Sequence, residues 1–86
     1  MVATELITRH VQPNPHKPGP ADAILRDSGV SVWILVEAYR ASENDADCVA
    51  QLWNLPREAV AAALAYYAQH AAAIDARIAA QRAAFA

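Results

Sequence analysis

Few side chains in this sequence could perform covalent chemistry. The three histidines are His10, His16 and His70, and the one thiol is Cys48. A catalytic nucleophile needs a base within hydrogen-bonding reach. No histidine stands at a spacing from Cys48, or from any of the three serines, that local structure would bring together. We therefore expect a protein that is not an enzyme.

Metal binding has equally little support in the sequence. His10 and His16 together with Asp22 are the one grouping of ligand types, but a fourth ligand is missing and the spacing matches no established zinc site. Cys48 has no partner for an internal disulfide, so nothing indicates an oxidising compartment, and we expect it to act as a small buried hydrophobe. We expect no cofactor.

Composition narrows the class of protein further. The 86 residues carry a net charge of −2, which is unfavourable for a protein that must neutralise phosphates. No stretch near Met1 resembles a signal peptide, and the apolar run Val32–Val36 is too short to span a bilayer. We expect one small domain in the cytoplasm, without membrane association.

The segment 1–30 is expected to form an extended arm. It holds four of the five prolines and both glycines, which disfavour a continuous helix. Leu6–Val11 and Ala23–Arg26 are the candidates for two short strands, paired as a loose hairpin. Because two strands alone are not stable in water, the arm must pack on the helices or on a second subunit.

The segment 31–86 is expected to be a helical domain. Helix signals predict helices over about 31–41, 45–53 and 56–84, with Ser31 as an N-cap and Pro56 at a helix start. This outline resembles a helix-turn-helix unit. The first of these helices is apolar nearly all round, so it is expected to lie at the centre of the core. The predicted core residues are Val32, Trp33, Val36, Tyr39, Val49, Leu52, Val60 and Leu64.

The last predicted helix carries an apolar stripe at heptad spacing, made of Val60, Leu64, Tyr67, Ala71, Ile74 and Ile78. A straight helix over 57–84 would be about 42 Å long, well beyond the radius of gyration of about 13 Å expected for the whole domain. We therefore expect its far end to project and to bind a partner. The predicted partner-binding residues are Tyr66, Tyr67, Ile74, Ile78 and Phe85.

DNA contact is the alternative that the helix-turn-helix outline suggests. The candidate reading helix begins with Arg57 directly followed by Glu58, and its first two turns hold no Asn, Gln, Lys or Ser to meet base edges. The remaining candidates for DNA contact are Arg9, Lys17 and Arg26 in the arm.

Two segments resemble a known family. They are Val30–Arg40 (VSVWILVEAYR) and Asn54–His70 (NLPREAVAAALAYYAQH), the second followed by Ile74-Asp75. Together they resemble the domain-of-unknown-function 433 family, small proteins often described as VapB-type antitoxins. The resemblance implies a mainly α fold, namely a homeodomain-like three-helix core with a short N-terminal β arm and a long C-terminal helix. It also implies a PIN-like ribonuclease toxin as partner and, with it, the control of the chain's own operator DNA.

Three functions follow as hypotheses. The first is an antitoxin-like protein, homodimeric, that neutralises a PIN-like ribonuclease through its C-terminal helix. The second is a homodimeric helix-turn-helix regulator that binds DNA. The third is a structural protein whose apolar stripe serves only self-association.

Overall fold

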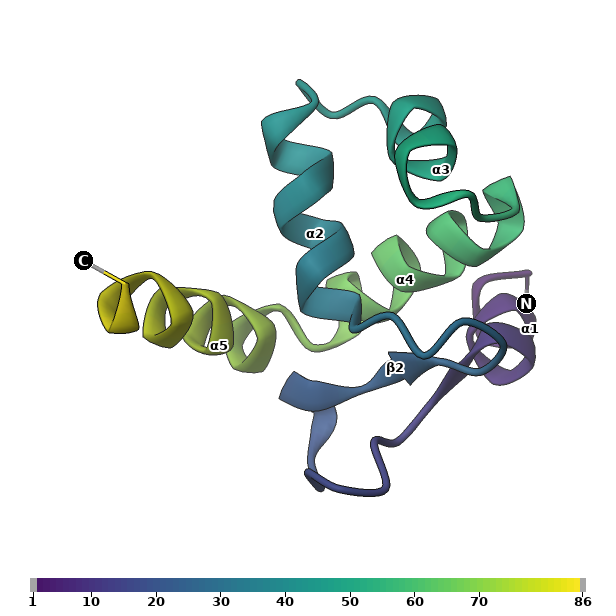
Figure 1. The fold of residues 1–86 in the computed structure, drawn as a ribbon. Coiled ribbons are helices and arrows are strands. Elements are labelled where there is room, and N and C mark those ends of the chain that lie inside the picture. Colours follow the sequence, from purple (N-terminus) through teal and green to yellow (C-terminus); the bar gives the residue numbers. More distant parts are fainter. Residues whose placement is uncertain (1, 86) are drawn as a thin grey trace.

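The computed structural model describes residues 2–85 and shows a mainly helical chain with one two-stranded antiparallel sheet (Figure 1). Met1 and Ala86, the end residues of the two predicted segments, lie outside the described residues. The elements in chain order are α1 (Val2–His10), β1 (Val11–Gln12), the 3₁₀ turn η1 (Pro20–Asp22), β2 (Ile24–Leu25), α2 (Val32–Ala41), α3 (Ala46–Trp53), α4 (Arg57–Gln69) and α5 (Ala71–Ala84).

Helix α4 lies at the centre of the molecule, where the sequence predicted the helix now labelled α2. Helices α1 and α2 both pack along α4, and α3 closes over its first turns. Ala59, Val60, Ala62 and Ala63 of α4 are buried. Because alanine is small, helices can approach α4 closely from more than one side, and this explains how an alanine-rich helix serves as the axis of the core.

The predicted strand over Leu6–Val11 is wrong, because residues 2–10 form α1. Leu6 and Ile7 are partly buried against the core, and Glu5 in the first turn and Arg9 in the last turn suit the helix dipole. The strand proper is only β1, which pairs with β2 in the register Val11 with Leu25 and Gln12 with Ile24. The sheet joins the end of α1 to the start of α2.

The predicted single helix over 56–84 is broken at His70, and this changes the shape of the molecule. His70 (φ −131°, ψ 34°) ends α4 and starts α5, and its N–H donates to the carbonyls of Tyr66 and Tyr67 at 3.1 and 3.0 Å. The break changes the direction of the chain, so that α5 packs on α2 and η1. The longest dimension of the molecule is 36 Å and the radius of gyration is 12.1 Å, so no rod of about 42 Å projects from it.

Helix α3 is capped at both ends. The side chain of Asp45 accepts a hydrogen bond from the Cys48 N–H at 3.1 Å, and Asn54 adopts a left-handed conformation (φ 53°) after the last turn. Val49 and Ala50 face the core. Leu52, predicted as a core residue, is 70% exposed. Leu52 lies about 60° round the helix from the buried Val49 and about 160° from Ala50, on a side of α3 that the rest of the chain leaves uncovered.

The other predicted core residues fall into two groups. Val32, Val36, Val49 and Val60 are buried. Trp33, Tyr39 and Leu64 are partly buried and pack against that core. Within residues 2–85, none of the helices combines the length and the apolar character needed to cross a membrane.

Candidate functional site

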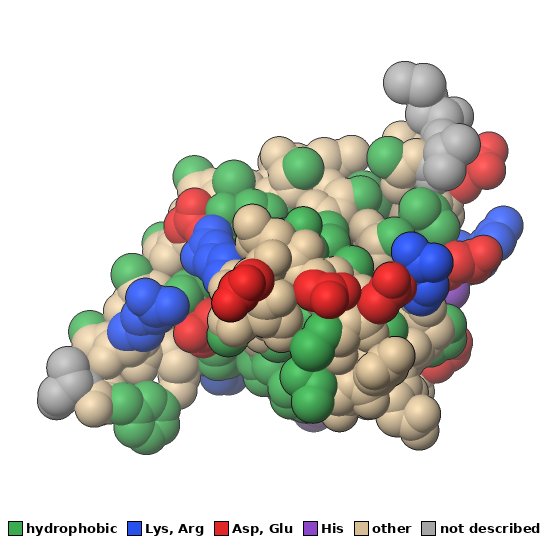
Figure 2. Space-filling model, turned by 90° about the horizontal axis from the view of Figure 1, so that it is seen from above, with side chains coloured by type: hydrophobic (Ala, Val, Ile, Leu, Met, Phe, Trp, Pro, Cys, Tyr) green, Lys and Arg blue, Asp and Glu red, His purple; other side chains and the backbone are tan. Residues whose placement is uncertain are grey.

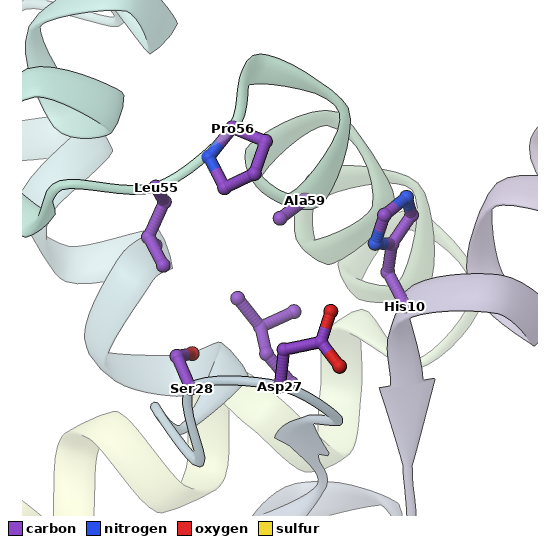
Figure 3. Close-up of a pocket in the computed structure, with 7 residues that line it drawn as sticks. His10, Asp27, Ser28, Leu55, Pro56 and Ala59 are labelled. Atoms are coloured by element: carbon purple, nitrogen blue, oxygen red, sulfur yellow. The ribbon is translucent and has the colours of Figure 1, made fainter.

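A small pocket lies between the end of α1, the turn after β2 and the start of α4 (Figure 3). His10, Asp27 and Ser28 supply its polar lining, and Leu25, Leu55 and Ala59 supply much of the rest. The pocket has a volume of about 80 Å³, which is small for a substrate. These three polar residues are of the types found in a nucleophilic triad, which is why their geometry matters.

That geometry does not link the three side chains. Figure 3 shows the Asp27 carboxylate turned toward the His10 ring, with Ser28 on the far side of the pocket. The hydroxyl of Ser28 accepts from the Val30 N–H at 3.3 Å. His10 Nε2 makes no hydrogen bond to the described residues, and its nearest acid is Glu58, with Oε2 at 3.5 Å. The pocket therefore lacks the nucleophile–base contact of a triad.

The three side chains considered as metal ligands, His10, His16 and Asp22, do not come together in the described part of the chain. His16 lies in the exposed loop before η1, and Asp22 accepts a hydrogen bond from Arg77 Nε at 3.1 Å. Among residues 2–85, no cluster of three or more His, Cys, Asp or Glu side chains could hold a metal ion. Cys48 is partly buried and forms no disulfide.

A polar cluster that the sequence did not reveal joins α2, α4 and α5. Arg40 Nη2 donates to Tyr67 Oη at 2.6 Å and to Asp75 Oδ1 at 2.8 Å, and Tyr67 Oη donates to the same Asp75 oxygen at 2.9 Å. The Arg40 guanidinium also lies 5.4 Å from the centre of the Tyr67 ring. The three residues are 27 and 35 positions apart, counted from Arg40, so no local spacing could have found them.

The hydrogen bonds of this cluster shift the titration of its members. The bond from Arg40, with that from Tyr67, lowers the pKa of Asp75. The pKa of Tyr67 is raised, chiefly by its hydrogen bond to the Asp75 carboxylate. The bond to Asp75 also raises the pKa of Arg40. Each shift favours the protonation state in which the cluster is intact, so the cluster is an anchor for α5 across most of the pH range.

Helix α5 is held to α2 by two further polar contacts. The Arg77 guanidinium stacks over the Trp33 ring at 4.6 Å while bonding to Asp22, and Arg82 Nε lies 3.6 Å from Glu37 Oε2. At the break, the His70 ring lies against the Tyr66 ring with centroids 4.4 Å apart, and burial raises the pKa of Tyr66. Tyr66 and Tyr67, which the sequence analysis predicted to bind a partner, are therefore partly buried within the chain.

The apolar residues of α5 that the sequence assigned to a partner are largely taken up within the chain. Ile74 is 0% and Ile78 is 3% exposed. The prediction that they form a free binding surface is wrong, because the break at His70 folds them onto α2 and η1. Phe85, at the end of α5, is 81% exposed.

The large apolar side chains that remain exposed are instead found mainly on α3. Leu52 is 70% and Trp53 is 41% exposed, and they are neighbours in the last turn. We call these two residues the α3 edge. Sequence reasoning missed it because Val49, Leu52 and Trp53 all fit a helical apolar pattern, and the pattern alone does not tell which members face the core.

Most basic side chains are engaged by acids of the same chain. The pairs are Arg9–Glu58, Arg40–Asp75, Arg57–Asp47, Arg77–Asp22 and Arg82–Glu37. Figure 2 shows basic and acidic side chains side by side on one face of the molecule. Of the predicted DNA contacts, Arg9 is paired, and Arg26 donates to the Thr8 carbonyl at 3.1 Å and to Gln12 Oε1 at 3.4 Å. Lys17 is exposed.

No family model, curated protein or solved structure matches this chain.

Proposed function

We propose that this chain is an antitoxin-like protein-binding module and that its partner surface is the α3 edge. The partner class, a PIN-like ribonuclease toxin, comes from the family resemblance of Val30–Arg40 and Asn54–His70. The homeodomain-like arrangement of α2, α3 and α4 belongs to the same proposal. The contact surface comes from the exposure of side chains, and it differs from the one that the sequence alone favoured.

The observation that carries the proposal is the exposure of Leu52 and Trp53, which follow each other in the last turn of α3. A single exposed leucine is ordinary on a protein surface. An exposed tryptophan is a different case, because tryptophan is among the residues most enriched in binding hot spots. Fully burying one such side chain is worth about 1.5–3 kcal/mol, so covering the α3 edge would stabilise a complex noticeably.

The DNA-binding alternative is less well supported by the position of α4. In a helix-turn-helix protein the second helix of the unit must enter the major groove. Here α1 packs along α4, and Glu58 at its start lies 3.9 Å from Arg9 and 3.5 Å from His10 of α1. A duplex would have to displace α1 to reach that face. The internal pairing of most arginines further weakens the attraction to phosphates.

A co-purification experiment tests the proposal. The tagged full chain is co-expressed with the product of the neighbouring gene, and the recovery of that product is measured for wild type, for Leu52→Ala/Trp53→Ala and for Gln51→Ala. Gln51 is an exposed α3 residue, so its variant controls for changes in the helix itself. We expect wild type and Gln51→Ala to retain the partner and the double variant to lose it.

Other outcomes would reassign the function. Retention by the double variant together with loss on Phe85→Ala would move the contact surface to the end of α5. If wild type ignores the partner but forms a dimer by light scattering that the double variant cannot form, self-association is the better account. Binding to the chain's own upstream DNA that disappears in an Arg9, Lys17, Arg26 triple alanine variant would favour the DNA regulator.

A further inference from the structure

A hollow of about 330 Å³ lies beside the Arg40 cluster, between α2, the turn that follows it and α4. Its lining consists of Val36, Tyr39, Arg40, Asn44, Leu64 and Tyr67. Its volume falls at the lower end of the range of about 300–1,000 Å³ that ligand pockets occupy. The proposed protein-binding function does not use this hollow, and none of its lining residues belongs to the α3 edge.

Arg40 gives the hollow its charge. One nitrogen of the guanidinium, Nη2, makes both hydrogen bonds of the cluster, to Tyr67 and to Asp75. Nε and Nη1 donate to no residue in the described part of the chain, and the Arg40 side chain is 42% exposed. A guanidinium carries five N–H donors in a fixed plane. Its remaining donors are therefore held in place by the cluster and are free to meet an acceptor.

The cluster also decides the sign of the ligand. The Asp75 oxygen that faces Arg40 already accepts from Arg40 and from Tyr67, so it offers little to an incoming cation. No lysine or second arginine lines the hollow. A phosphate would bring more negative charge next to the Asp75 carboxylate than a carboxylate would, and the hollow has only one guanidinium to offset it. A single carboxylate matches the donors that remain.

The rest of the lining describes the group that would carry this carboxylate. Tyr39 and Tyr67 provide aromatic surfaces, and Val36 and Leu64 provide aliphatic ones. Asn44 sits in the left-handed conformation (φ 62°), fixed by a hydrogen bond from its N–H to the Tyr39 carbonyl at 2.9 Å. Its side-chain amide adds a neutral donor and acceptor to the lining.

We propose that this hollow binds a monocarboxylate carried on an aromatic or branched apolar group. Two sources share this chemistry, namely a free aromatic acid and the C-terminal residue of a peptide. The carboxylate would accept from Arg40, the apolar group would lie against the two tyrosines, and Asn44 would meet a polar atom at the rim.

The test is an NMR titration of the ¹⁵N-labelled full chain with four probes. Phenylacetate and N-acetylphenylalanine carry the carboxylate, and phenylacetamide and N-acetylphenylalaninamide are their neutral counterparts. We expect both acids to shift the amide signals of Asn44, Leu64 and Tyr67 in a saturable way. A charge-assisted hydrogen bond is worth about 1.5–3 kcal/mol, so the neutral amides should bind at least about tenfold more weakly.

Variants separate this site from general attraction to positive charge. Arg40→Gln should weaken binding of the acids at least about tenfold, whereas Arg82→Gln, which removes another exposed, paired arginine, should leave it unchanged. If Arg40→Gln does not fold, Asn44→Gly serves instead, because glycine tolerates the left-handed turn while the amide is lost. We expect that variant to bind more weakly than wild type.

Three outcomes would overturn the proposal. They are equal binding of acids and amides, shifts spread over the surface instead of gathered at the hollow, and an equal loss in the Arg40 and Arg82 variants. If N-acetylphenylalanine binds more tightly than phenylacetate, the natural ligand is a peptide terminus. The reverse order indicates a small aromatic acid. Neither order depends on whether the neighbouring gene's product binds the α3 edge.

Discussion

Helices α3 and α5 lie at opposite ends of the molecule (Figure 1). They differ in whether their large apolar side chains are buried or exposed. Helix α5 has two isoleucines in an otherwise alanine-rich sequence, and both are buried. Helix α3 buries Val49 and Ala50 but leaves the larger Leu52 and Trp53 exposed. A helix that hides its few large residues is being used to build the fold. A helix that exposes its largest ones has surface left over for another molecule.

The polar contacts of the two helices follow the same division. Those of α5 run to α2, α4 and η1 through Asp75, Arg77 and Arg82, and the least exposed of these pairs joins Arg77 (22% exposed) to Asp22 (21% exposed). The ion pair of α3 joins Asp47 to Arg57 at 2.6 Å, but these side chains are 57% and 80% exposed. Solvent weakens such exposed pairs, so α3 is held mainly by Val49 and its caps.

The largest expected effect comes from truncating a buried residue of α5. Ile74→Ala should lower the free energy of unfolding by about 2–5 kcal/mol, because it removes buried methyl groups and leaves a cavity. Leu52→Ala should change it by no more than about 0.5 kcal/mol. Urea unfolding followed by circular dichroism measures both. Equal losses in the free energy of unfolding for the two variants would show that the α3 edge is packed in solution. The difference between α3 and α5 would then disappear.

The arginine contacts should rank in the same order at a smaller scale. Arg77→Met should lower the free energy of unfolding by about 1–2 kcal/mol, since it removes both the stacking on Trp33 and a hydrogen bond to a carboxylate. Arg57→Met should lower it by about 0–1 kcal/mol, as exposed pairs do. The same urea experiment compares them. A larger loss from Arg57→Met would mean that α3 depends on its ion pair more than its exposure suggests.

Parts of this arrangement could be predicted from the sequence, because local signals fix them. The ends of α2 and α3 lie within one residue of the prediction. Ser31 and Pro56 stand at the N-cap positions without a side-chain capping bond, and Asp45 caps α3 through its carboxylate. The strand predicted over Leu6–Val11 failed over residues 6–10 because Leu6 and Ile7 also fit one face of a helix, and packing of α1 on α4 selects the helix.

Neither the break at His70 nor the candidate functional surfaces could be predicted from local sequence signals. No proline or glycine marks the break, and α5 turns there because burial of Ile74 and Ile78 and the Arg40–Tyr67–Asp75 cluster stabilise the turned arrangement. The cluster joins residues distant in sequence. The α3 edge depends on which side of a short helix the rest of the chain covers, and only the tertiary structure decides that.

Low pH should weaken the attachment of α5 to the rest of the chain, because Asp75 becomes protonated. Because the pKa of Asp75 is lowered in the folded chain, the unfolded chain takes up the proton first as the pH falls. The stability that Asp75 contributes is therefore present above its ordinary pKa of 3.8 and is lost as the pH falls below that value. Asp75→Asn should lower stability at pH 7 and make it less dependent on pH between about 4 and 2.

Thermal unfolding of wild type and Asp75→Asn between about pH 4 and pH 2 measures this dependence of stability on pH. Asp27→Asn is the control, since Asp27 lies outside the cluster and forms no ion pair with residues 2–85. An unchanged acid dependence in Asp75→Asn would show that the cluster does not hold α5 in solution.

The smallest effect is expected at the end of α5, where Phe85 resembles the residues of α3 and not those of its own helix. Phe85 is 81% exposed beyond the last residue of α5, so Phe85→Ala should change the free energy of unfolding by no more than about 0.5 kcal/mol. Urea unfolding of this variant beside Ile78→Ala, which should cost about 2–5 kcal/mol, compares Phe85 with a buried residue of α5. A loss from Phe85→Ala close to that of Ile78→Ala would mean that the phenyl ring is covered in solution. The division would then no longer run between α3 and α5, because α5 too would carry a surface that another molecule covers.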